Sequence, residues 1–256
     1  MEAGKIRFLR LCHEELSREK VRDGIGLLAE KRLHGLLKRW VIDDPTCHEV
    51  RVDAAGTRRF VADIMMSEGE IVEVQTGSLY PLRQKIAFYM EQTAHTVTVL
   101  HPLFTTKYIS WLDGKSGEVT SRVRSPLHQT PLHGLAELKP YIKYLGDPRF
   151  SLLFLMITAD EYRLLDGWGK GGKRGSHRFE LIPLTLEDTC RLCAREDYAA
   201  LFPQNEQLSV PFTAKTFGKV TRLKGYDIYD ALAVFEALGV IEKCGKEGRA
   251  ALYRKI

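Results

Sequence analysis

The sequence has few cysteines and lacks any long apolar run. Five cysteines occur among 256 residues, which does not match the dense disulfide framework of a small secreted protein. No uninterrupted run of about 18 apolar residues is present, so no membrane-spanning helix is expected. The first ten residues carry charges and lack the apolar core of a signal peptide. These absences predict a cytoplasmic protein with no membrane partner.

Internal repeats and low-complexity tracts are also missing, and the charge balance is only mildly basic. The formal net charge is +5 and 44% of the residues are hydrophobic. That composition is enough for one large core, or for a medium domain with a small one. The excess of positive charge is compatible with DNA as a partner and equally compatible with an ordinary solvated surface.

The first two thirds of the chain predict an α/β domain. Leu33, Leu36, Leu37 and Trp40 repeat at helical spacing, which predicts an amphipathic helix over about 25–41. Turn residues separate three strand-like runs after it. The predicted elements are helices at 5–23, 25–41, 79–93 and 132–145, and strands at 48–53, 59–66, 70–75, 95–101, 107–112, 118–124 and 150–158.

The composition changes at the glycine-rich, basic stretch 166–178, which predicts a connection between domains. After it we expect helices at 187–201, 213–220 and 227–238, then strands at 240–243 and 250–254. Three helices followed by a two-stranded wing is the order of a winged helix-turn-helix domain. The predicted organisation is an α/β domain at 1–165, a linker at 166–180 and a winged helix at 181–256.

Two carboxylates of the second and third predicted strands are expected to meet. If Met66 and Glu70 flank the turn between these strands, counting back places Asp63 opposite Glu73. Such a pair repels itself unless a cation or a proton lies between the two groups. Mg²⁺ accepts one or two carboxylates and keeps its other positions for water and phosphate. Strand alternation also places Gln75 on the same side as Glu73.

These residues resemble the active-site motif of the PD-(D/E)XK nuclease superfamily. The superfamily carries a Glu on a helix, then an Asp, then Glu-X-Lys on a hairpin; this sequence has Glu30, Asp63 and Glu73-Val74-Gln75. The resemblance implies a restriction-endonuclease-like core with a mixed central sheet flanked by helices. It also implies hydrolysis of DNA with Mg²⁺ or Mn²⁺ bound by Asp63 and Glu73, and with Glu30 completing the metal shell.

The sequence departs from the superfamily pattern at two positions. Ala62 stands where the superfamily has proline, and Gln75 stands where it has lysine. Glutamine can hold a water molecule through its amide but cannot act as a cation or a base. Some restriction endonucleases of the superfamily carry Glu-X-Gln, so Gln75 is expected to position the attacking water. Lys85, on the next helix, could supply the missing charge from another position of the backbone.

A second resemblance extends over nearly the whole chain. The segments VQTGSLYPLRQKI, HTVTVLHPL and TTKYISWLDGKSGEVTSRVRSPLH, with the later PFT and GKEGRAALY, are similar to a bacterial family without an assigned function. In that family a nuclease-like domain precedes a winged-helix tail. The resemblance therefore supports the predicted architecture and adds little about the substrate.

Basic residues occur at places where they could contact phosphate groups. These residues are Lys85, Lys107, Arg122, Arg124, Lys173, Arg174, Arg222, Lys224, Lys246 and Arg249. For any one of them, a solvated surface position is an equal alternative. Cys190 and Cys193 form a single CxxC, which is weak evidence for zinc, and a helix that buries two small side chains is the simpler interpretation.

Other interpretations of the same residues stay open. Asp63 could form a structural ion pair, for example with Arg51 or Arg59, and Glu73 could do the same. The protein could be a DNA-binding or protein-interaction protein that keeps the nuclease fold without its chemistry. Asp227 and Asp230 near the start of the third helix favour docking of a partner over entry into a DNA groove. A homodimer is an additional expectation, because cutting both DNA strands requires two sites.

Overall fold

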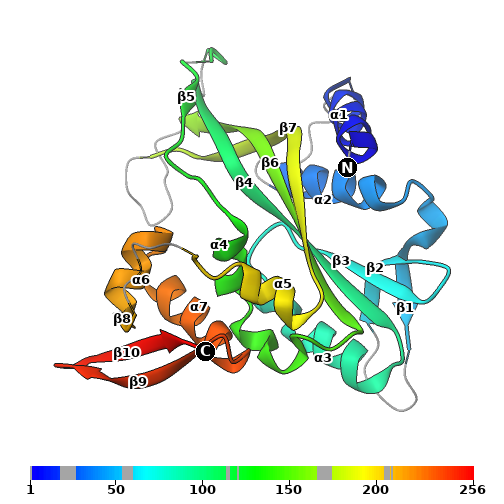
Figure 1. Ribbon diagram of the computed structural model, residues 1–256. Coiled ribbons are helices and arrows are strands. Elements are labelled where there is room, and N and C mark those ends of the chain that lie inside the picture. Colours follow the sequence, from blue (N-terminus) through cyan, green and yellow to red (C-terminus); the bar gives the residue numbers. More distant parts are fainter. Residues whose placement is uncertain are drawn as a thin grey trace.

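A mixed β-sheet forms the centre of the molecule (Figure 1). The computed structural model describes residues 2–17, 27–53, 60–113, 116–119, 121–165, 175–204, 208 and 210–256. Within these residues the central sheet has seven strands in the order β1-β2-β3-β4-β6-β7, and β5 pairs with β4. No described helix is both long enough and apolar enough to cross a membrane. The predicted α/β class with a mixed sheet flanked by helices is confirmed.

Two helices and a three-stranded meander open the chain. They are α1 (Glu2–Ser17), α2 (Leu27–Val41), the 3-10 helix η1 (Pro45–Cys47), β1 (His48–Val52), β2 (Phe60–Met65) and β3 (Glu70–Val74). Both pairings in the meander are antiparallel. The turn between β2 and β3 is closed by the N–H of Met66, which donates to the carbonyl oxygen of Glu70 at 2.8 Å. Gly69 has a φ of 79° in this turn, a conformation that favours glycine.

A helical crossover connects β3 to its parallel neighbour. It consists of η2 (Tyr80–Leu82) and α3 (Arg83–Gln92), and it leads into β4 (Thr96–Asp113). Strands β3 and β4 then run parallel, from the pair Glu70–Thr96 to the pair Val74–Leu100. The expected order of helix, antiparallel meander, helix and strand is therefore present.

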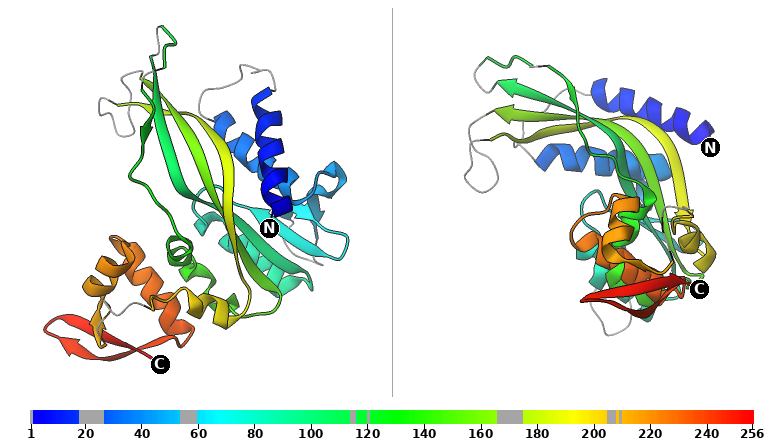
Figure 2. Two further views of the ribbon diagram at one scale, coloured as in Figure 1. Left: turned by 45° about the horizontal axis from the view of Figure 1, so that its top comes forward. Right: turned by 60° about the vertical axis from the view of Figure 1, so that its left-hand side comes forward.

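Three long strands extend the sheet. Besides β4 they are β6 (Phe150–Leu165) and β7 (His177–Leu192), and they run together toward the end of the molecule opposite the C-terminal elements (Figure 2). The two strands predicted at 95–101 and 107–112 are one continuous strand, which passes through Pro102. The predicted hairpin partner is the short β5 (Val123–Arg124), antiparallel to β4. Between β5 and β6 lie α4 (Pro131–Ala136) and η3 (Lys139–Tyr144).

The predicted helix at 187–201 is wrong over its first half. Residues 177–192 form β7, which pairs antiparallel with β6 along its length, and only α5 (Arg195–Ala200) is helical. Cys190 lies on this strand and Cys193 just after it, so they are not on a helix. The stretch predicted as an interdomain linker instead connects β6 to β7, although residues 166–174 lie outside the described part. The central sheet thus extends to Leu192, beyond the predicted boundary at 165.

The remaining elements form a small unit around five aromatic side chains. They are β8 (Phe212–Thr213), α6 (Ala214–Thr221), α7 (Tyr226–Ala237), β9 (Ile241–Glu247) and β10 (Ala250–Lys255), with a second sheet in the order β8-β10-β9. Thr213 caps α6, because its hydroxyl accepts the N–H of Thr216. The aromatic cluster consists of Phe202, Phe212, Phe217, Phe235 and Tyr253.

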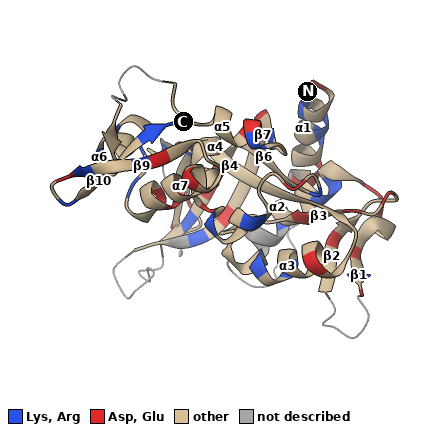
Figure 3. Ribbon diagram, turned by 60° about the horizontal axis from the view of Figure 1, so that its bottom comes forward, with Lys and Arg blue, Asp and Glu red and all other residues tan. Residues whose placement is uncertain are grey.

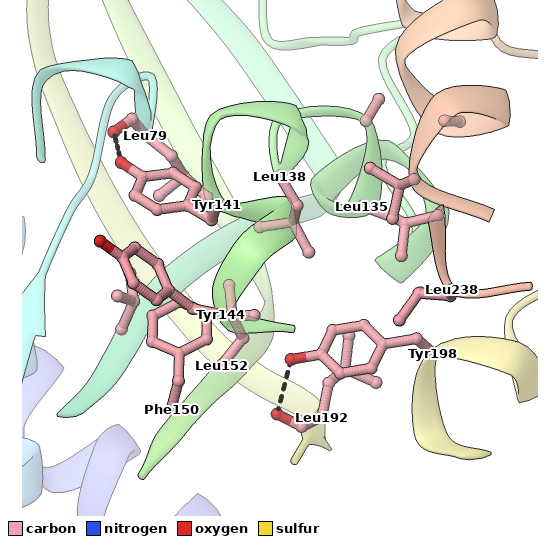
Figure 4. Close-up of a cluster of buried hydrophobic side chains, with 14 of the residues drawn as sticks. Leu79, Leu135, Leu138, Tyr141, Tyr144, Phe150, Leu152, Leu192, Tyr198 and Leu238 are labelled. Atoms are coloured by element: carbon pink, nitrogen blue, oxygen red, sulfur yellow. Dashed lines mark hydrogen bonds between the residues drawn. The ribbon is translucent and has the colours of Figure 1, made fainter. Parts of the chain in front are cut away.

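Two hydrophobic cores hold these elements together. One lies between the sheet and α1 and α2, and contains Phe8, Leu33 and Leu37. The other lies against α3 and α4 and continues without a break into the C-terminal unit. Figure 4 shows Leu238, just after α7, facing Leu135 and Leu138, next to Tyr198 of α5. The C-terminal unit therefore packs directly on the sheet domain.

Candidate functional site

The central feature of the candidate site is the point where β2 and β3 separate. The register pairs Ile64 with Val72 and Met65 with Ile71, and its continuation places Asp63 opposite Glu73, as predicted. At that point the carboxylate of Asp63 takes the place of a backbone partner: Oδ2 accepts the N–H of Val74 at 2.8 Å. The sheet therefore fixes the Asp63 side chain through the backbone of the Glu-X-Gln segment.

Glu73 is fully buried, and both of its carboxylate oxygens are hydrogen-bonded. Oε2 accepts from the ammonium group of Lys85 at 2.6 Å, and Oε1 accepts from the hydroxyl of Tyr89 at 3.0 Å. Lys85 and Tyr89 lie four residues apart on α3, so both face β3. The structure thus brings Lys85, from the helix that follows β3, to Glu73. In the superfamily pattern the lysine is at the position that Gln75 occupies in this sequence.

Burial and a neighbouring negative charge govern the protonation of Glu73. Removal from water, reinforced by the charge of Asp63, raises its pKa to about 8, although Lys85 and Tyr89 act in the opposite direction. Burial alone would also raise the pKa of Asp63. There the hydrogen bond from His34 and the charge of Lys85 prevail, and the pKa stays below its usual value. The lowered pKa keeps Asp63 ionised at neutral pH, whereas burial favours the protonated form of Glu73 even beside Lys85.

His34 joins the site from α2. Its Nε2 lies 3.5 Å from Oδ1 of Asp63, and its side chain is about one third exposed, at 32%. The sequence analysis did not assign His34 to the site. A signal for it exists, because His34 lies one helical turn after Glu30, on the helix where the superfamily carries a metal-shell residue. The backbone of Glu30 lies in α2, but its side chain is outside the described part of the structure, so its predicted role stays a prediction.

A second acidic side chain approaches Asp63 from β1. The pairs His48–Ile64 and Val50–Ala62 place Glu49 opposite Asp63. Glu49 has a φ of 54°, a left-handed conformation that is rare for residues other than glycine and that interrupts the β1–β2 ladder. One ligand atom each of His34, Glu49 and Asp63 lies within 4.8 Å of the other two. The carboxylate of Glu49 also pairs with the ammonium group of Lys38, a buried residue of α2.

Gln75 is hydrogen-bonded through both its side chain and its backbone. Its side-chain amide donates to the carbonyl oxygen of Ser78 at 2.8 Å, in the loop after β3. Its backbone N–H donates to the carbonyl oxygen of Leu100, and its own carbonyl oxygen lies 2.7 Å from Nδ1 of the buried His101. In this arrangement Gln75 anchors the end of β3, and its predicted role in positioning water stays a prediction.

The predicted phosphate-contacting residues other than Lys85, which is paired with Glu73, differ in their exposure. Lys107 is a correction, because it is buried and its ammonium group lies 2.6 Å from the carboxylate of the buried Glu161, which leaves it no access to a phosphate. Arg122 is partly exposed, pairs with Asp160 at 2.8 Å and lies over the ring of Tyr108. The exposed positions are Arg124, Arg222, Lys224, Lys246 and Arg249, whereas Lys173 and Arg174 lie outside the described part.

The alternative of a structural ion pair between Asp63 and an arginine stays a prediction. The described partners of Asp63 are His34 and the backbone of Val74, and Arg59 is outside the described part. The donor types suit a divalent cation, but the described ligand atoms that lie within 4.8 Å of one another belong to His34, Glu49 and Asp63, and not to Glu73. Glu73 is already paired with Lys85, so a cation bound to Glu73 would have to displace that ammonium group.

Comparison with known proteins identifies one family. Its model, described as a domain of unknown function (DUF8091), matches residues 31–193. Comparisons with curated proteins and with solved structures give no match. The matched segment begins within α2, contains Asp63, Glu73 and Lys85, and ends one residue after β7. Because this segment covers more than half of the chain, the protein belongs to the DUF8091 family.

Proposed function

We propose that the protein is a divalent-metal-dependent nuclease that hydrolyses phosphodiester bonds of DNA. The observation that carries this proposal is the convergence of Asp63, Glu73 and Lys85, with Lys85 Nζ 2.6 Å from Glu73 Oε2. A pair of carboxylates beside one lysine is the donor set of the PD-(D/E)XK motif. The lysine comes from α3 in place of the motif position that Gln75 occupies.

Each residue of the proposed site would have its own role. Asp63 and Glu73 would hold Mg²⁺ or Mn²⁺. The bound cation would lower the pKa of a water molecule and neutralise charge at the phosphorus. Tyr89 and the N–H of Val74 hold the two carboxylates in place through hydrogen bonds. Lys85 would leave Glu73 for the attacking water or the phosphate once the cation balances the carboxylate.

The arrangement of elements supports the same proposal. The succession of α2, the β1–β3 meander, α3 and the parallel β4 is the order of a restriction-endonuclease-like core. Asp63 and Glu73 lie on the second and third strands, where that core carries its motif. The PD-(D/E)XK assignment rests on this order together with the geometry of the three side chains.

We further propose that residues 195–256 form a winged helix that contributes to DNA binding. Three helices and a sheet in the order β8-β10-β9 support this assignment. Arg222 and Lys224 precede the third helix, and Lys246 and Arg249 lie at the turn between β9 and β10. Figure 3 shows basic residues on this hairpin with acidic residues beside them. The side of α7 that carries Asp230 faces η3, where Lys139 binds Asp230 at 2.7 Å.

The test uses plasmid, linear and branched DNA with Mg²⁺ or Mn²⁺. Wild-type protein is expected to cleave at least one substrate, and a chelator is expected to stop cleavage. Asp63→Asn and Glu73→Gln are each expected to lower the rate by about 100-fold or more. Glu68→Gln is the matched control, because it removes an exposed carboxylate from the turn between the same strands. Cleavage that survives Asp63→Asn would refute the assigned site.

One observation favours a second candidate, a DNA-binding or partner-binding protein that lacks nuclease activity. Glu73 is fully buried and already bound at both oxygens, as a structural carboxylate would be. Calorimetric titration with Mn²⁺ separates the two proposals. A bound Mn²⁺ that Glu73→Gln removes supports the nuclease, whereas wild-type protein in which no bound Mn²⁺ depends on Glu73 supports the second candidate.

A further inference from the structure

The group formed by His34, Glu49 and Asp63 lies beside the proposed nuclease centre and contains a residue that the nuclease motif does not use. Glu49 comes from β1, and its ligand atom lies within 4.8 Å of those of His34 and Asp63. Three elements, α2, β1 and β2, therefore converge on one point. We propose that these three side chains form a second divalent-cation site, selective for transition metals over Mg²⁺, which shares Asp63 with the first.

The backbone of Glu49 supports a functional role for its position. A left-handed φ of 54° in a strand costs conformational energy for a residue with a side chain. The strain lies directly opposite Asp63, where both the β1–β2 and the β2–β3 ladders are interrupted. Such strain at a cluster of ligand-type side chains is typical of a binding site and is unexpected for an ordinary strand residue.

Of the three side chains, that of Asp63 is the least exposed and that of Glu49 the most exposed. The exposed fraction is 14% for Asp63, 32% for His34 and 63% for Glu49. A cation here would have protein ligands on one side and an open side for water or a phosphate oxygen, as catalytic metal sites do. Glu49 is exposed enough to move the short distance that ligation requires.

When no cation is bound, the ammonium group of Lys38 balances the negative charge of Glu49. This ammonium group is buried and pairs with Glu49, so it takes the position that a metal ion would fill for that carboxylate. A divalent cation would compete with it for Glu49. Lys38 and His34 lie four residues apart on α2 and therefore face the β1–β2 pair together.

The imidazole determines the kind of ion. Mg²⁺ prefers oxygen ligands and keeps several waters, whereas first-row transition metals accept imidazole readily. A site with two carboxylates and one histidine therefore favours Mn²⁺ and its heavier neighbours over Mg²⁺. The inference rests on the proposed function only through the sharing of Asp63, and its test does not require DNA cleavage.

The experiment titrates the full, metal-free chain with Mn²⁺ and records electron paramagnetic resonance. Bound Mn²⁺ is expected to show magnetic coupling to an imidazole nitrogen, and His34→Gln is expected to remove that coupling. Glu49→Gln and His34→Gln are expected to weaken binding of this ion by about tenfold or more. Glu68→Gln and His13→Gln, which change exposed residues of the same kinds, are expected to leave it unchanged.

Two outcomes would overturn the inference: wild-type protein without nitrogen coupling, or an unchanged affinity in Glu49→Gln. Glu49 is mostly exposed, so this variant is expected to fold. Lys38→Met adds an independent check, because removal of the competing ammonium group is expected to tighten Mn²⁺ binding several-fold. A purely structural Lys38–Glu49 pair would leave that affinity unchanged.

The same experiment separates this inference from the proposed function. Glu73→Gln is expected to keep the nitrogen-coupled Mn²⁺ while losing DNA cleavage. Nitrogen coupling in a protein that cleaves no DNA would support the second site and refute the nuclease. DNA cleavage without nitrogen coupling would support the nuclease and refute the second site.

Discussion

At the scale of single residues, the burial of Glu73 has a direct consequence for stability. An unfolded glutamate has a pKa near 4.5, and in the fold the pKa is about 8. The folded state therefore holds a proton more tightly, so this group stabilises the fold most at low pH. Metal-free protein is expected to lose stability between pH 5 and pH 8, by about 1.4 kcal/mol for each pH unit.

Urea denaturation at several pH values, with a chelator present, measures this loss. Glu73→Gln cannot titrate, and its free energy of unfolding is expected to vary much less over the same range. The control, Glu91→Gln, removes an exposed carboxylate that pairs with Lys143, and it should keep the wild-type slope. A wild-type stability that rises from pH 5 to pH 8 would show that Glu73 is ionised without metal.

Lys85 allows the sharpest test of a catalytic assignment. Lys85→Met is expected to lower cleavage by about 100-fold without weakening Mn²⁺ binding, because the lysine is not a metal ligand and competes with the cation for Glu73. The double variant Lys85→Met/Gln75→Lys restores a lysine at the motif position and is expected to recover part of the activity. Full activity in Lys85→Met alone would remove Lys85 from the mechanism. Lys143→Met, at an exposed lysine near the end of α3, is the control.

Some of these residues could be predicted from the sequence, and others could not. Asp63 and Glu73 could be, because a short turn fixes the register of a hairpin and alternation fixes its faces. Lys85 was considered, but its contact with Glu73 depends on how α3 lies against β3. His34 and Glu49 depend on the docking of α2 and on a left-handed backbone conformation, neither of which a local sequence pattern encodes.

At the scale of elements, the largest error concerns β7. Its last residues, Glu187–Leu192, continue into the helical segment Arg195–Ala200 without a strong break, so the sequence favours one helix. Pairing with β6 along the whole strand overrides that local preference. The meander was predicted well because glycine and polar turn residues separate its strands.

The contact between α4 and β6 depends on a glycine. A Cβ atom at Gly134 would lie 2.5 Å from the ring of Phe154, so no side chain fits there. Gly134→Ala is expected to destabilise the fold by about 1–3 kcal/mol, measured as a lower midpoint of thermal unfolding.

Gly35 in α2 provides the comparison. A Cβ there meets nothing within 4 Å, so Gly35→Ala is expected to stabilise the protein by up to about 1 kcal/mol through helix propensity. Equal effects of the two substitutions would show that the contact between α4 and Phe154 is looser than described.

At the scale of the whole molecule, the C-terminal unit is a packed part of the protein. Its core continues into that of the sheet domain, and α7 contacts α4 and η3. Because α7 is packed against these elements, it is not free to lie along its whole length in a DNA groove. The proposed DNA contacts come from the start of α7 and from the β9–β10 turn.

Salt dependence of DNA binding tests those contacts. Replacing Arg222, Lys224, Lys246 and Arg249 by alanine is expected to weaken binding. It is also expected to reduce the slope of log affinity against log salt by up to about 4. The control, Lys107→Met, concerns a buried lysine and should leave the slope unchanged. An unchanged slope in the fourfold variant would show that DNA binds another surface of the protein or does not bind at all.

The most direct test of the proposed nuclease centre is a crystal structure with Mn²⁺. The account predicts an anomalous density peak bonded to the carboxylates of both Asp63 and Glu73, with Lys85 displaced from Glu73. A crystal at saturating Mn²⁺ in which Lys85 still binds Glu73, and no peak touches that carboxylate, would contradict it.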